Sequence, residues 1–261
     1  MRWSKSMRGD AWNPVAPSDQ QRSPLSGVRT QHHHPRILAA TLATILAAIA
    51  GTPACAQATP TSPRFVVVLD AAHGGDDLGT RLGNEAEKAY TLALGVRLRS
   101  LLAARGFTVV TTRESDTNVD PDRRAEIANR ANAQACLSLH ATESGAGVHL
   151  FISSLAASQG SRFAAWRTAQ SAAVTRSLSL AGVLNSALTH AGISVTLGRS
   201  ALPGVDSMTC PAVAVEVSPD RSSDAQAAAG IDDPDYQARV ADAIAAALVE
   251  WRSQTRENGR P

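Results

Sequence analysis

The chain has 261 residues, of which 44% are hydrophobic and 18% charged, and its formal net charge is +2. This ordinary globular composition excludes the collagen-like, coiled-coil and largely disordered classes. Aromatic residues make up only 4%, and the excess basic residues lie in residues 1–56, so we expect no nucleic-acid partner.

An export signal is predicted at the N-terminus. Residues 37–50 form an apolar run, and small residues at Ala54 and Ala56 follow it. This is the pattern of a secretory signal peptide, and the run is short for a membrane span. We therefore interpret residues 1–56 as an N-terminal extension with a signal peptide, either cleaved after Ala56 or retained as an anchor. The mature chain is then exported to the periplasm or cell envelope and has no membrane span, and residues 57–63 form a linker.

Apolar runs and helical stripes alternate along residues 64–252, which we interpret as one domain. Strands are predicted at residues 65–69, 107–112, 135–139, 148–152 and 212–217, and helices at residues 85–104, 120–132, 171–191 and 236–251. Strands separated by helices predict an α/β fold with a mostly parallel, twisted sheet of about six strands and helices on both faces. Residues 253–261 are polar and are expected to form a C-terminal tail.

Two cysteines follow the predicted leader. Cys136 and Cys210 each lie in or beside an apolar run, where cysteine often serves as a small buried hydrophobic residue. An oxidising compartment permits a disulfide, but two cysteines do not define a disulfide framework, and we expect two separate thiols.

Histidines and carboxylates gather at strand ends and at one helix start. His73 follows the first predicted strand, Glu87 begins the first helix, His140 follows a later strand, and Glu216 ends the last. The carboxyl ends of parallel strands meet at one edge of a sheet, where sites form. Two histidines and one carboxylate are a recurrent catalytic zinc set that leaves a position open for water. A further carboxylate can act as a base toward that water.

Each residue alone has an ordinary structural explanation. A histidine at a strand end is usually hydrogen-bonded structure, and Glu87 suits the positive end of a helix dipole. Glu216 is harder to explain in this way, because burying an unpaired carboxylate is costly. His149, inside a strand, and His190, near a helix end, are interpreted as structural.

The chemistry-bearing residues occur in a recognisable order. The motifs are Asp70–Gly79 (DAAHGGDDLG), Glu87-Lys88, Thr112-Arg113 with Asp116, Arg124-Ala125 with Ala128-Asn129, Ser138–Ala141 (SLHA), and Pro211–Glu216 (PAVAVE). In order and spacing they resemble the N-acetylmuramoyl-L-alanine amidase family, the zinc-dependent peptidoglycan amidases. The resemblance spans most of residues 64–251.

The resemblance implies a role for each matching residue. It makes His73, Glu87 and His140 the ligands of one Zn²⁺ per chain and Glu216 the catalytic base. Glu85 is a weaker candidate ligand than Glu87, because no lysine follows it. The implied reaction is hydrolysis of the amide between N-acetylmuramic acid and L-alanine, so the implied partner is a peptidoglycan glycan–peptide strand. Nothing in the sequence identifies a protein activator.

Three departures from the family motif stand near these residues. Ala72 replaces a glycine, Thr142 replaces an asparagine, and Val217-Ser218-Pro219-Asp220 replaces a Gly-Phe-x-x-Asn run. We expect these changes to affect substrate contacts and rate more than the metal. They leave two alternatives open: an envelope protein that binds the cell wall without cleaving it, and a zinc hydrolase of another amide or of an acetyl group.

Other residues have supporting interpretations. Asp70 is expected to orient the metal loop by accepting hydrogen bonds, and Arg113 to form a structural ion pair. The long connections 153–170 and 198–210 are expected to form the walls of a substrate groove.

Overall fold

The computed structural model describes residues 64–157, 166–221 and 228–258. The predicted leader, residues 1–56, and the linker, residues 57–63, lie outside the described residues. In chain order the elements are β1 (Val66–Ala71), β2 (Arg81–Leu82), β3 (Glu85–Ala86), α1 (Glu87–Ala104), β4 (Thr108–Thr111), α2 (Pro121–Arg130), β5 (Ala135–Ala141), β6 (Val148–Ser153), the 3-10 segment η1 (Trp166–Ala172), α3 (Val174–His190), β7 (Val195–Ser200), the 3-10 segment η2 (Val205–Ser207), β8 (Ala212–Val217) and α4 (Pro234–Asn258).

Six strands form the main sheet, in the order β4-β1-β5-β8-β6-β7. The pairs β1–β4, β1–β5, β5–β8 and β6–β7 are parallel, and β6–β8 is antiparallel. The short strands β2 and β3 form a separate hairpin that leads into α1. The predicted fold class, a mostly parallel sheet of about six strands in one α/β domain, is confirmed.

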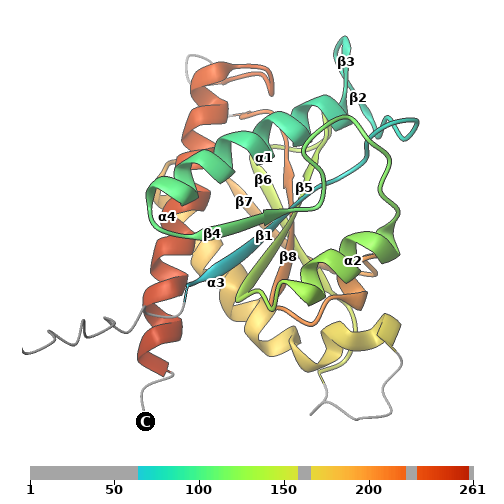
Figure 1. The fold of residues 1–261 in the computed structure, drawn as a ribbon. Coiled ribbons are helices and arrows are strands. Elements are labelled where there is room, and N and C mark those ends of the chain that lie inside the picture. Colours follow the sequence, from blue (N-terminus) through green and yellow to red (C-terminus); the bar gives the residue numbers. More distant parts are fainter. Residues whose placement is uncertain (1–63, 158–165, 222–227, 259–261) are drawn as a thin grey trace, which may run out of the picture. The chain divides into compact units, whose positions relative to one another are not determined.

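The sheet has a hydrophobic cluster on each face. On one face, leucines of α1 and α3 and apolar residues of α4 pack against alternate strand residues such as Val67, Leu137 and Val215. On the other face, Ala125 and Ala128 of α2 pack with strand residues that point the opposite way, which are Val68, Cys136 and Ala212 of β1, β5 and β8. Figure 1 shows α2 on the opposite side of the sheet from α1 and α4. Helices therefore cover both faces, as expected.

Strand β7 was not predicted from the sequence. Among the residues that the structure describes, Val195–Ser200 pairs with β6 alone and forms an edge of the sheet, and most of its side chains are exposed. A strand with little burial lacks the apolar run or the clean alternation that identifies a strand in a sequence. Residues 198–200, expected as part of a connection, therefore belong to the sheet.

Two helix ends also differ from the expected positions. Helix α1 begins at Glu87 because Glu85–Ala86 pairs with β2. Helix α4 continues to Asn258, past the predicted end at Trp251. Of the helices that the structure describes, none is both long and apolar enough to cross a membrane.

The expectation of two separate thiols is wrong. Cys136 at the start of β5 and Cys210 just before β8 form a disulfide, with their Cα atoms 6.1 Å apart. The two strands are adjacent, and the backbone amide of Cys136 donates to the carbonyl oxygen of Pro211. The pairing depends on which strands are neighbours, which the local sequence around each cysteine does not encode.

Candidate metal centre

The loop after β1 places His73 at the carboxyl edge of the sheet. The φ angle of His73 is 62°, and Gly74 and Gly75 follow at 132° and 60°. A histidine in the left-handed region is uncommon and costs free energy, so the surroundings must hold it there. Ala72 does not have a positive φ: its amide continues the ladder by donating to Leu139. The departure from glycine at Ala72 is therefore accommodated without strain.

Two buried arginines hold this loop by its carbonyl oxygens. Arg124 donates to the carbonyl oxygens of Ala71 and His73 at 2.6 and 2.8 Å. Arg113 donates to those of Ala71 and Ala72 at 2.9 and 3.0 Å. Arg113 is thus structural, as expected, but within the described residues it forms hydrogen bonds and not the ion pair we predicted.

Asp70 is the buried carboxylate that joins the loop to β5. It accepts hydrogen bonds from Arg124, Thr112 and the Ser138 hydroxyl at 2.7, 2.7 and 2.8 Å. The Ser138 oxygen in turn lies 3.5 Å from Nε2 of His140. Asp70 therefore supports both the His73 loop and the His140 ring, although it contacts neither imidazole directly.

Glu87, the first residue of α1, lies between the two histidines. Its Oε2 is 3.2 Å from His73 Nε2 and its Oε1 is 3.1 Å from His140 Nδ1. The same carboxylate accepts hydrogen bonds from the backbone amides of Thr80 and Ala141. The side chain is only 3% exposed. Burial alone would raise the pKa of Glu87, but these hydrogen bonds, above all that from His140, hold its pKa well below the usual range.

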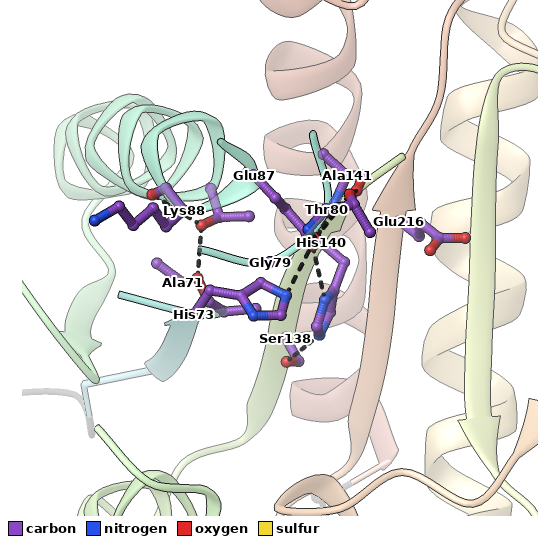
Figure 2. A network of polar contacts seen from close by, with 12 residues as sticks. Ala71, His73, Gly79, Thr80, Glu87, Lys88, Ser138, His140, Ala141 and Glu216 are labelled. Carbon is purple, nitrogen blue, oxygen red and sulfur yellow. Dashed lines mark hydrogen bonds and ion pairs between the residues drawn. The ribbon is translucent and has the colours of Figure 1, made fainter. Parts of the chain in front are cut away.

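Three side chains thus meet at one point (Figure 2). One ligand atom each from His73, Glu87 and His140 all lie within 4.8 Å of one another. Gly79 makes room for them, because a Cβ there would lie 2.6 Å from the His73 ring and 2.7 Å from Glu87 Oε2. Two imidazole nitrogens and a carboxylate are the donor set of a catalytic zinc site with an open position. The residues present fit this metal.

In both rings the nitrogen that does not contact Glu87 has a partner of its own. His73 Nδ1 is 2.8 Å from Asp77 Oδ2, and His140 Nε2 faces Ser138. Such partners fix the tautomer and orientation of metal-ligating histidines. The hydrogen bond to Glu87 raises the pKa of His73, although burial opposes it, and the Asp77 contact adds to the rise. Without a metal, the contact with Glu87 therefore favours the protonated form of His73.

Glu216 lies beside this cluster but does not face it. In the β5–β8 ladder it is the register neighbour of His140. Its Oε2 is 3.1 Å from Nδ1 of His149 on β6, and Figure 2 shows its carboxylate turned away from His73 and His140. Its role as base stays a prediction. His149, expected to be structural, thus contacts the proposed base, and the register of β6 against β8 brings the two together.

The expected groove walls are described in part, because residues 158–165 lie outside the described residues. Where the two connections are described, they contact each other. Gln170 donates to the carbonyl oxygens of Met208 and Cys210, both at 2.9 Å. Their role as walls stays a prediction.

Fold and cluster together define an α/β domain with a candidate His-Glu-His metal site at the carboxyl ends of its strands. Comparison with known proteins places it further. The sequence pattern of the N-acetylmuramoyl-L-alanine amidase family matches residues 67–250. The chain belongs to this family, and the resemblance in the motifs is confirmed.

Individual relatives agree with this assignment. The chain is 33% identical over 89 residues to a germination-specific N-acetylmuramoyl-L-alanine amidase of Bacillus subtilis, covering 29% of this chain and 38% of the relative. It is 38% identical over 87 residues to the amidase AmiA of Escherichia coli, covering 33% and 30%. The chain thus matches 30–38% of the length of these two relatives.

A solved structure matches over a larger share. The catalytic domain of CwlV, an N-acetylmuramoyl-L-alanine amidase from Bacillus (Paenibacillus) polymyxa var. colistinus, is 27% identical, with a TM-score of 0.55. The match covers 72% of this chain and 98% of that domain.

Proposed function

We propose that this chain is a zinc-dependent N-acetylmuramoyl-L-alanine amidase that cleaves peptidoglycan. The observation that carries the proposal is the convergence of His73, Glu87 and His140 within 4.8 Å at the carboxyl edge of the sheet, in a chain of the amidase family. These three residues are the proposed ligands of one Zn²⁺. When bound, zinc would lower the pKa of a water toward about 7 and polarise the scissile carbonyl.

Glu216 is the proposed base. Its carboxylate takes a proton from the attacking water and delivers it to the nitrogen of L-alanine as the carbon–nitrogen bond breaks. The water oxygen stays on the lactyl carbon of N-acetylmuramic acid, which leaves as a carboxylic acid. Support comes from the position of Glu216, which is next to His140 in the β5–β8 ladder. A general base of this kind contributes about 10²–10⁴-fold to the rate.

The proposed location is the periplasm or cell envelope. The apolar run at residues 37–50 supports export. The Cys136–Cys210 disulfide supports it independently, because disulfides persist mainly in oxidising compartments outside the cytosol. A protein activator stays unidentified.

Zinc content and product analysis test this proposal. Purified protein is assayed on cell walls, with mass spectrometry of the products and counting of new L-alanine amino groups. We expect about one zinc per chain, and a loss of turnover in Glu216→Gln with zinc retained. The control, Glu257→Gln, removes a carboxylate exposed near the end of α4 and should be as active as wild type.

Each alternative has its own outcome. Wall binding without turnover at saturating zinc would establish a non-catalytic envelope protein, an alternative that the altered residues 217–220 keep open. Cleavage at another bond would establish a different hydrolase. Wild-type protein that binds no zinc, or Glu216→Gln with full activity, would refute the proposed mechanism.

A further inference from the structure

We propose that His149 is a positioning residue for Glu216. Its imidazole holds the carboxylate of the proposed base, and the loop of residues 142–147, clasped by residues 217–219, holds the imidazole. This inference rests on the proposed function, since it gives the proposed base a partner that neither the sequence motifs nor the comparisons assign.

The contact lies within one row of residues across the sheet. Glu216 on β8 is the register neighbour of both His140 on β5 and His149 on β6. Register neighbours project from the same face of a sheet, so Glu216 stands between His140 and His149 in this row, with its carboxylate turned to the His149 side. His149 Nδ1 lies 3.1 Å from Glu216 Oε2, and the two side chains are 16% and 31% exposed. The base is thus open to a substrate, while the residue that holds it is mostly covered.

The His149 ring is enclosed by the backbone of the 142–147 loop. Gly145, with φ +87°, lies so close that a Cβ there would be 2.3 Å from the ring carbon Cε1 and 2.6 Å from Nε2. The Phe151 ring also makes an edge contact with the His149 ring, with centroids 6.3 Å apart. The ring therefore has little freedom to turn its Nδ1 away from Glu216.

The loop is held in turn by the segment that follows Glu216. The contacts join its two ends and its middle to that segment: Thr142 N to Val217 O at 2.9 Å, Ser218 N to Gly147 O at 2.8 Å, Gly147 N to Pro219 O at 2.9 Å, and Ser218 Oγ to Ser144 O at 3.0 Å. Inside the loop, Thr142 Oγ1 accepts from the amide of Ser144 at 3.1 Å. Tyr236 of α4 anchors the segment by donating its hydroxyl to the Ser218 carbonyl oxygen at 2.8 Å.

Two departures from the family motif, at Thr142 and at Ser218, therefore act on the same loop. Thr142 shapes the loop, and Ser218 in the altered 217–220 run fastens it. Together they set the wall against which His149 packs. The altered run thus has a structural role next to the proposed base, and its presence can be explained without a loss of function.

The hydrogen bond from His149 occupies one oxygen of the carboxylate. Within the described chain, Oε1 of Glu216 has no hydrogen-bond partner, so it is the oxygen available for proton transfer. A base works only within hydrogen-bond reach of the proton it removes, and misplacing a reacting group by about 1 Å can cost about 10²-fold. Holding Oε2 fixes where Oε1 points.

Two substitutions separate positioning from packing. His149→Asn keeps an N–H donor near the position of Nδ1 but leaves unfilled volume, whereas His149→Leu fills the volume and removes the donor. Positioning predicts that His149→Leu lowers kcat by about 10- to 100-fold, within the contribution of a general base, with KM and zinc content unchanged. It also predicts that His149→Asn keeps kcat within about threefold of wild type, a loss small beside the about 10²-fold cost of a misplaced group. The control, His190→Leu, replaces an exposed histidine at the end of α3 and should match wild type.

Packing alone predicts the reverse order, with His149→Asn the more damaged in thermal unfolding and kcat unaffected in both variants. That result, or an equal loss of kcat in both, would overturn the inference. Crystal structures of both variants give a readout that needs no activity: the Glu216 carboxylate should keep its orientation with asparagine and lose it with leucine. If wild type proves inactive, the proposed function fails, and an unmoved carboxylate in His149→Leu would still refute the positioning role.

Discussion

Removing the Cys136–Cys210 disulfide should measurably lower the stability of the fold. The bond joins residues 74 positions apart, and cross-linking a loop of that length removes entropy from the unfolded chain worth about 4.5 kcal/mol at 25 °C. Measured disulfides usually deliver about 2–4 kcal/mol. At about 2–4 °C per kcal/mol for a domain of this size, we expect the melting temperature to fall by about 4–16 °C.

The substitution should leave the metal site intact. Cys136 lies at the start of β5 and His140 near its end, and the ladders with β1 and β8 hold the residues between them. Zinc affinity and kcat at 25 °C should therefore stay close to wild type.

The assay compares three samples by urea and thermal unfolding, with the zinc content of each determined. They are wild type, wild type reduced with a phosphine, and the double variant Cys136→Ala with Cys210→Ala. Both cysteines are almost fully buried, so the alanine variant also loses some packing and should be slightly less stable than the reduced protein. Two free thiols in unreduced, unfolded wild type, or an unchanged melting temperature on reduction, would refute the reasoning.

Three shorter predictions concern the site. Glu87→Gln should weaken zinc binding by at least about 10–100-fold, which is the usual cost of losing even an outer-shell partner. Metal analysis after dialysis checks this, and full retention of zinc would exclude Glu87 as a ligand. Zinc affinity should rise with pH, by up to about tenfold per pH unit below the pKa of His73, and zinc binding should release protons. The reason is that Glu87 raises that pKa and only the neutral imidazole binds zinc. Calorimetry in two buffers measures the affinity and the proton release, and an affinity independent of pH between 6 and 8 would contradict the prediction. Gly145→Ala should destabilise the fold by about 1–3 kcal/mol in urea unfolding, because a side chain at a positive φ would also meet His149; wild-type stability would argue against the enclosed ring.

The buried parallel strands could be read from the sequence because burial on both faces leaves continuous apolar runs. Residues 65–69 and 212–217 show this pattern, and both form strands. Strand β7 has no such run, since it lies at the edge and is largely exposed. The disulfide was missed for a different reason, because it depends on the adjacency of β5 and β8, and strand order is a property of the whole fold.

The candidate ligands could be predicted because each sits at a position that parallel topology brings together. His73 follows β1, His140 lies near the end of the neighbouring strand β5, and Glu87 begins the helix after β1. The contact between His149 and Glu216 could not be predicted in this way. It requires knowing that β6 runs antiparallel to β8 and in which register, and an isolated histidine in a strand carries no signal of either.

The site is held from two sides by different parts of the chain, and the departures from the family motif fall unevenly between them. The ligand side depends on Arg113, Arg124 and Asp70, which grip the His73 loop and support His140. There the one departure, Ala72, leaves the backbone geometry unstrained. Thr142 and the 217–220 run both lie on the other side, around the base. Under the proposed function, zinc binding would depend on the first side and the placement of the proposed base on the second, so two of the three departures fall where rate and substrate contacts would be set.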